Sequence, residues 1–163
     1  MRTDDLPRLV EALKPPIAEF VRESRVRIAL LINGSGQVLA QHGFTRSYEV
    51  MNVASLAAAA HASARALAEM TRAQRWTHLH HAGKDRQLFL APVKTPIAEL
   101  ILVAIFDNET SLGIVQLFFE HLTSGIAHLP EFQNALAETT QQNFESDLEA
   151  GLYKVLTEPS SEA

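Results

Sequence analysis

The sequence predicts a single α+β domain in which strands joined by tight turns pack against helices. Residues 100–106 form an apolar run of seven, too short to cross a membrane and typical of a strand buried on both faces. Turns containing glycine at 33–36 and 83–85 separate apolar segments, as in β-hairpins. Residues 51–72 are rich in alanine, which favours a long helix. A length of 163 residues suits one domain with a sizeable core.

Composition excludes several classes of partner and site. The net charge of −5 gives no general affinity for phosphate backbones, so nucleic acid and acidic membrane surfaces are poor candidates. The chain has no cysteine, which excludes disulfides, thiolate metal sites and cysteine nucleophiles and suits a reducing compartment. Residues 1–13 carry acids where a signal peptide would be continuously apolar. We therefore expect a cytoplasmic protein that is not inserted in a membrane.

The first elements are an amphipathic helical segment and a hairpin. Apolar residues between 4 and 24 have helical spacing, but Pro15 and Pro16 interrupt them, which predicts two short helices or one kinked helix. Residues 26–32 and 37–41 are expected to pair as strands across the turn at 33–36. This turn is not a phosphate-binding loop, because no Lys-Ser/Thr follows it and no helix begins there.

The helix expected at 51–72 has two faces. The face assigned to the sheet holds Val53, Leu56, Ala57, Ala60, Ala64 and Leu67. The opposite face holds Ser55, Ala58, Ala59, Ala62 and Ala66, with Arg65 and Glu69 alongside. Solvated helix faces usually carry long charged side chains, so this nearly bare face favours a close contact with another helix, from a second subunit or a partner. The alternative is that alanine serves only as a helix former.

Three further strands and a helix complete the expected domain. Strands are predicted at 76–82, 87–93 and 98–106, the first two joined by the turn at 83–85. Asp107, Asn108, Thr110 and Ser111 favour a turn and an N-cap before a helix that starts at Leu112. Apolar residues then recur at helical spacing until Pro130, which should stop or kink this helix. Phe144, Leu148, Leu152 and Leu156 predict a short terminal amphipathic helix, followed by a disordered tail.

Few residues suggest chemistry. His78, His80 and His81 are the best metal candidates, since His78 and His80 point to one side of a strand. Two imidazoles without a third ligand make a weak case, and histidines on the surface of an edge strand are the commoner explanation. Asp107 and Glu109 could form an acid–base pair, but turn and capping roles explain both. Four arginines could reach a phosphate in a partner, and nothing selects one of them: Arg65, Arg72, Arg75 and Arg86. No nucleophile elbow, metalloprotease motif or nucleotide loop is present, so we expect no enzyme activity, cofactor or metal.

The expected elements follow in the order helix, strand, strand, helix, strand, strand, strand, helix. Four sequence segments match this order. They are LLINGSGQVLAQHG, VASLAAAA, HHAGKDRQLFLAPV and ILVAIFDNETSLGIVQLFF. With these segments the chain resembles the roadblock/LC7 family over roughly residues 25–129, and within it the bacterial MglB-like regulators of MglA-type Ras-like GTPases. The turn Phe-Asp-Asn-x-Thr-Ser-Leu-Gly is the most specific piece of the resemblance.

The resemblance implies a profilin-like α/β/α sandwich. A five-stranded antiparallel sheet would carry the central helix on one face and the terminal helices on the other. The corresponding division is an N-terminal helical segment (1–24), a roadblock/LC7 core (25–130) and a C-terminal extension (131–163). Such proteins form homodimers whose sheets join edge to edge and whose central helices lie side by side, and one dimer grips one GTPase.

The resemblance also assigns residues. The GTPase-binding residues would be Ala58, Ala59, Ala62, Arg65, Ala66 and Glu69. The dimer interface would include Ser55, Ala62, His78, Leu79 and His80. The C-terminal helix would contact the GTPase through Phe144, Leu148, Leu152 and Leu156.

Three functions follow as hypotheses. The first is a GTPase-activating regulator that reorganises the switch region of the GTPase without an inserted arginine, and whose C-terminal helix favours nucleotide exchange. The second is a scaffold of the same fold that binds a GTPase or a polarity complex without changing turnover. The third, a small-molecule sensor, would need a concave apolar pocket with convergent polar groups. Cell polarity or motility is a family association.

Overall fold

The computed structural model describes residues 5–43, 47–73 and 76–134, and beyond them positions 137, 140, 144, 146 and 148. Its elements, in order, are α1 (Asp5–Ser24), β1 (Ile28–Asn33), β2 (Val38–His42), α2 (Ser47–Met70), β3 (Leu79–Ala82), β4 (Gln87–Lys94), β5 (Glu99–Phe106) and α3 (Leu112–Ala127). The five strands form one antiparallel sheet in the order β2-β1-β5-β4-β3. This confirms the α+β class and the five-stranded antiparallel sheet.

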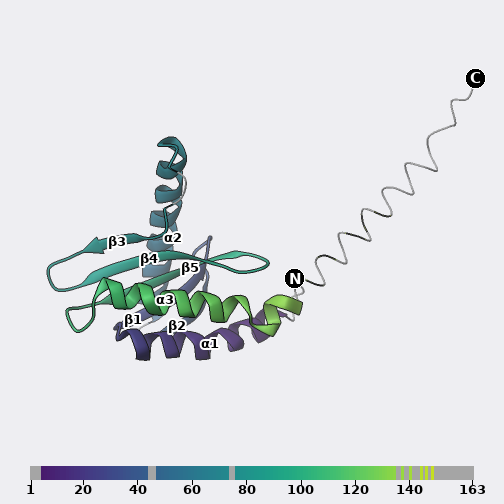
Figure 1. The fold of residues 1–163 in the computed structure, drawn as a ribbon, viewed down its shortest axis with the longest axis horizontal. Coiled ribbons are helices and arrows are strands. Elements are labelled where there is room, and N and C mark those ends of the chain that lie inside the picture. The colour runs from purple at the N-terminus through teal and green to yellow at the C-terminus, as the bar shows by residue number, and fades with distance from the viewer. Residues whose placement is uncertain are drawn as a thin grey trace, which may run out of the picture.

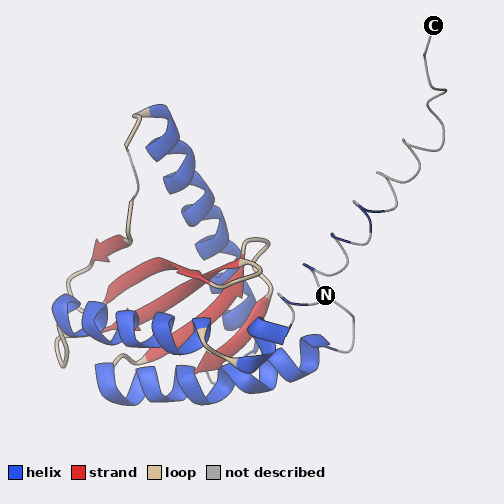
Figure 2. Cartoon of the chain, turned by 45° about the vertical axis from the view of Figure 1, so that its right-hand side comes forward, coloured by secondary structure: helices blue, strands red, loops and turns tan. Residues whose placement is uncertain are grey.

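The sheet separates two helical layers (Figure 1). Helices α1 and α3 run beside each other on one face, and α2 lies on the other. In both views the C-terminal half of α2 rises away from the sheet, and a connection returns from its end to β3 (Figure 2). The sheet therefore positions two different surfaces, one on each side.

Strand β5 supplies both sides of the core from the centre of the sheet. Leu102 and Phe106 belong to the cluster under α1 and α3, whereas Ile101 and Val103 belong to the cluster under α2. The alternation of side chains along a strand sends consecutive residues to opposite faces. A strand covered on both faces must be apolar throughout, so the prediction of a doubly buried strand is confirmed.

Helix α1 is continuous through Pro15 and Pro16, so the alternative of two short helices is wrong. Each proline removes one helical N–H donor, which ordinarily disfavours a helix interior. Pro15 lies on the exposed side, where water can bond the carbonyl left without a partner. On the other side Leu13 and Ile17, which flank the two prolines, are buried against the sheet. The helix therefore packs on the same sheet face before and after the prolines.

The β1–β2 hairpin is closed by Asn33, whose side-chain oxygen accepts hydrogen bonds from the backbone N–H groups of Ser35 (3.1 Å) and Gln37 (2.9 Å). Gly36 has φ +84°, and a Cβ atom added there would lie 3.3 Å from the Cα of Ser55 in α2. The turn therefore needs glycine both for its backbone conformation and because it rests directly on α2.

The turn before α3 is held by a charged cluster. Arg27 donates to Asp107 (2.7 Å) and also contacts Glu109 (2.6 Å). The backbone N–H of Glu109, together with Arg27, holds the pKa of Asp107 below its ordinary value, and Asp107 raises the pKa of Arg27. Ser111 is the N-cap of α3 and accepts from the N–H of Ile114. The predicted turn and N-cap are confirmed.

The start of β3 differs from the sequence prediction, and the end of α3 agrees with it. Strand β3 begins at Leu79 rather than Trp76, because in the β3–β4 register Thr77 would stand opposite Pro92, which has no N–H to donate. Helix α3 ends at Ala127, and a separate helical turn starts at Pro130, so that proline does end the helix. Phe144 and Leu148 are exposed, and the other two apolar residues predicted for the terminal helix, Leu152 and Leu156, lie outside the described residues.

Candidate functional site

The orientation of α2 defines the candidate site. Its buried side chains, Val50, Ala54, Ala57 and Ala58, all come from the first half of the helix and pack on the sheet. The facing sheet surface is built from bulky residues such as Leu30, Ile101 and Val103, so only small side chains let the helix come close. From 59 to 70, a stretch that the structure describes completely, no residue is buried.

This orientation corrects the sequence analysis at three residues. Leu56 and Leu67, assigned to the sheet, are 71% and 50% exposed. Ala58, assigned to the outward GTPase-binding face, is 8% exposed and belongs to the core. Nine of the 24 residues of this helix are alanine and they lie on both faces, so hydrophobic periodicity gives little contrast between its faces, and leucine was wrongly taken to mark the buried side.

The outward side of α2 is consequently more apolar than expected. Large exposed residues alternate along the helix with small or short ones: Met51 near its start, then Leu56, Leu67 and Met70 (81% exposed). We refer to the set Ser55, Leu56, Ala59, Ala62, Ala66, Leu67 and Met70 as the exposed α2 surface; all seven are exposed. Contiguous exposed apolar area of this kind marks interaction sites in soluble proteins.

The sequence analysis placed four of these seven residues on the outward face: Ser55, Ala59, Ala62 and Ala66. It missed the three large ones. Leu67 and Met70 lie 11 and 14 positions after Leu56, close to whole numbers of helical turns, so spacing groups the three near one face, but it does not tell whether that face is buried or outward. Arg65 and Glu69, also predicted to bind the GTPase, are exposed beside this surface.

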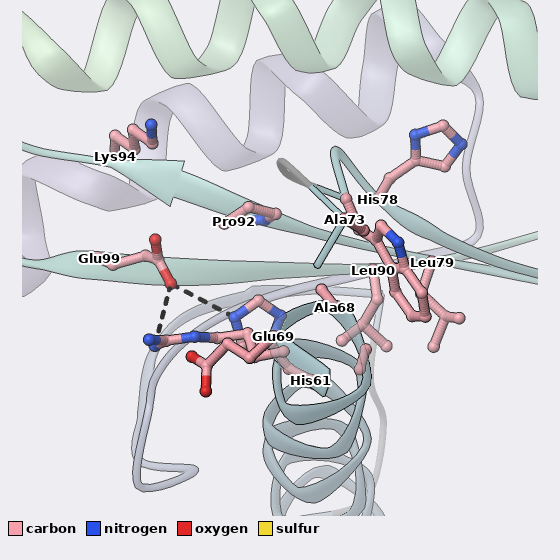
Figure 3. Close-up of a pocket in the computed structure, with 13 residues that line it drawn as sticks. His61, Ala68, Glu69, Ala73, His78, Leu79, Leu90, Pro92, Lys94 and Glu99 are labelled. Carbon is pink, nitrogen blue, oxygen red and sulfur yellow. Dashed lines mark hydrogen bonds and ion pairs between the residues drawn. The ribbon is translucent and has the colours of Figure 1, made fainter. Parts of the chain in front are cut away.

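A cavity of about 300 Å³ lies between the C-terminal half of α2 and strands β3 and β4 (Figure 3). Ala64, Ala68, Leu79, Leu90 and Pro92 supply its apolar walls, and Trp76 stands at its margin. The cavity exists because α2 leaves the sheet at an angle, so the space beneath its second half is not filled by this chain's described residues.

Polar groups gather at one end of this cavity around Glu99. His61 Nε2 lies 3.3 Å from Glu99 Oε1, and an Arg65 guanidinium nitrogen lies 3.8 Å from the same oxygen (Figure 3). Both Arg65 and Glu99 are partly solvated, so the pair adds little to stability. The contact ties the side chain of Arg65 to β5, on the flank of the exposed α2 surface.

Strand β3, which carries Leu79 and His80 of the predicted dimer interface and follows directly after His78, is an edge of the sheet. His78 stacks on Phe89 and lies 3.2 Å from the Gln116 amide nitrogen, while His80 lies 2.9 Å from the Gln87 amide oxygen. These contacts place both histidines on the same side of the sheet, the side covered by α3, and Leu79 lies on the α2 side. No cluster of three or more potential metal-ligating His, Asp or Glu side chains occurs in the part of the chain that the structure describes.

The family of the chain is decided by its sequence. The profile of the roadblock/LC7 domain matches residues 17–106, more than half of the chain. The chain belongs to the roadblock/LC7 family. The match spans α1 to β5 and so includes the exposed α2 surface and the β3 edge.

Solved roadblock/LC7 structures superpose on most of this chain. MglB from Myxococcus xanthus has 23% identity and a TM-score of 0.64, covering 78% of this chain and 90% of its own. The gliding protein MglB from Thermus thermophilus has 26% identity and a TM-score of 0.62, with 82% and 95% covered. An MglB with a tetrameric arrangement has 27% identity and a TM-score of 0.62, with 83% and 96% covered.

Two further comparisons complete the description of this roadblock/LC7 chain. No curated protein sequence matches it. Among the described residues, no helix is both long and apolar enough to cross a membrane.

Proposed function

We propose that this chain is a homodimeric, MglB-like regulator of a small Ras-like GTPase. The observation that carries the proposal is the exposed α2 surface, which presents Leu56, Leu67 and Met70 to solvent beside an edge strand. Apolar side chains in this arrangement need a protein cover, and an unpaired strand edge invites pairing with a second chain. The likeness to MglB structures at 26–27% identity supports the same direction.

In this proposal the dimer forms through pairing of the two β3 strands and packing of the two α2 helices. The proposed contact includes Ser55, Ala62 and Leu79. His80 in β3 and His78 just before it lie along the same sheet edge. Small side chains at Ala59, Ala62 and Ala66 let a second backbone approach α2 closely, and the larger neighbours supply buried area. Light scattering of the purified chain tests this step, and a monomer at every workable concentration would contradict it.

The GTPase is proposed to bind across the exposed α2 surface, with Arg65 and Glu69 at its flank. Activation would come from ordering the switch region of the GTPase so that its own residues hold the attacking water in line. The regulator then supplies no catalytic residue.

The decisive measurement is GTP turnover by the cognate Ras-like protein with and without the chain at saturating concentration. Acceleration is the expected result. The alternative function, a non-activating scaffold for a GTPase or polarity complex, predicts binding with unchanged turnover. Absence of both binding and acceleration contradicts both.

Nucleotide exchange is a separate proposed activity of the C-terminal segment. Phe144 and Leu148 are exposed and spaced by one helical turn, so they can present an apolar contact to the GTPase. Replacing both with serine in the full chain should slow release of a fluorescent GDP analogue without changing GTP hydrolysis. Unchanged release in this variant would exclude the segment from exchange.

A further inference from the structure

A second open surface lies on the opposite side of the sheet from α2. Helices α1 and α3 run beside each other there (Figure 2), and between them is a groove of about 620 Å³. Its floor is apolar, since Phe20 and Leu122 are buried and Phe118 and Leu129 are partly so. None of these residues belongs to the exposed α2 surface or to the cavity beside β3.

Gly125 lines the groove without a side chain. A Cβ atom added at this position would meet no other atom within 4 Å, and the residue sits in α3 one turn after the groove-lining His121. Glycine inside a helix costs about 1 kcal/mol relative to alanine. Neither tight packing nor a positive φ requires glycine here, so a larger side chain at this position would project into the open space of the groove.

The rim of the groove is acidic. Glu19 and Glu23 line it, and among the residues that the structure describes no Lys or Arg does. Arg22 contacts both carboxylates, at 3.6 and 3.0 Å, so one positive charge is shared by two negative ones and the rim keeps a net negative charge. Glu23 also lies in the last turn of α1, where the aligned peptide dipoles add negative potential.

We propose that this groove binds a short helical segment of a partner protein other than the GTPase. An apolar side chain of that segment enters the space over Gly125 and packs on Phe118 and Leu122. Lysine or arginine one turn away reaches Glu19 and Glu23. Laying an apolar helical stripe into a groove between helices is a recurrent mode of recognition, and the acidic rim selects a basic flank.

The acidic rim argues against the chain's own C-terminal segment as the occupant. Phe144 and Leu148 stand among Glu145, Asp147 and Glu149, so folding them into the groove would bring like charges together. Like charges placed face to face disfavour a contact. The proposal is independent of the proposed function, because it concerns the other face of the sheet and requires no GTPase.

The test uses two labelled helical peptides and the full chain. One peptide carries leucine at positions i, i+3, i+4 and i+7 with lysine on the flanks, and the other replaces every lysine with glutamate. Fluorescence anisotropy should give tighter binding of the lysine peptide by about tenfold or more. Gly125→Leu should remove that binding by filling the groove, and Glu19→Gln with Glu23→Gln should weaken it and its dependence on salt.

Gly113→Leu is the matched control. Gly113 is the other glycine of α3, and a Cβ there would meet only the Ser111 hydroxyl oxygen, at 4.0 Å. Both variants replace an exposed helical glycine with leucine, but only Gly125 lines the groove. Equal effects of the two variants, or equal binding of the two peptides, would overturn the proposal.

Other occupants give different results in the same variants. If Gly125→Leu dissociates an oligomer seen by light scattering while Gly113→Leu does not, a second copy fills the groove and the proposal is wrong. If Gly125→Leu instead increases hydrogen exchange in residues 144–163 of the full chain, the C-terminal segment fills it, and the proposal is again wrong.

Discussion

The two halves of α2 are both helical but lie in opposite environments. Residues 47–58 place Val50, Ala54 and Ala57 against the sheet, whereas residues 59–70 contribute nothing to the core. The second half ends through local bonds such as that from the Thr71 hydroxyl to the Leu67 carbonyl (2.8 Å). Its six alanines favour the helix by propensity without any core contact, while the sheet decides which half is buried.

The largest expected effect comes from a charge in the buried half. Ala54→Arg should destabilise the fold by about 3 kcal/mol or more, because the side chain has no room beneath α2 and its charge no partner there. Urea unfolding measures this loss. A change below about 1 kcal/mol would mean that the first half is not held against the sheet.

The same substitution in the second half should act on binding alone. Ala62→Arg should change stability by no more than about 0.5 kcal/mol, because the residue is exposed. Under the proposed function it should weaken self-association or GTPase binding by about tenfold or more. Light scattering measures the self-association, and a titration with the GTPase measures the binding affinity. Unfolding of this variant would show that the faces of α2 are assigned incorrectly.

A smaller effect separates propensity from packing. Ala66→Gly removes no buried contact, so it should cost only the difference in helix propensity, about 1 kcal/mol. Ala57→Gly, in the buried half, should cost more, since it also removes a methyl group from the core. Equal losses in the two variants would contradict the division of the helix at residue 58.

The smallest expected effect lies outside α2 and serves as a reference for both halves. The folded pKa of Asp107 is lowered, so its contribution to stability is present above its ordinary pKa and is lost as pH falls through the folded value. Asp107→Asn should therefore be slightly destabilising at pH 7 and nearly neutral at about pH 2 to 3. Thermal unfolding of both proteins at both pH values checks this. A stability difference that does not change with pH would mean that the ionised carboxylate is not its cause.

Sequence reasoning succeeded where local chemistry is strong. The run at 100–106, the N-cap Ser111 and the turn at Asn33 each carry their structure in adjacent residues. It failed for the faces of α2, where the rotation of the helix is decided by the bulky sheet residues and not by its own pattern. The β3 boundary was missed because it depends on Pro92, a residue 15 positions after Thr77.

Anchoring at one end gives α2 the properties of a lever. The turn at Gly36 lies against the helix at Ser55, next to its buried half, whereas the second half has no buried residue and reaches the sheet through side chains such as His61 and Arg65 at Glu99. From Ala58 to Met70 a helix extends about 18 Å at 1.5 Å per residue. A tilt of roughly 5° at the base would displace the tip by about 1.6 Å. A protein that grips the tip can thereby pull on the β1–β2 turn, and strain in that turn can in reverse redirect what the tip holds.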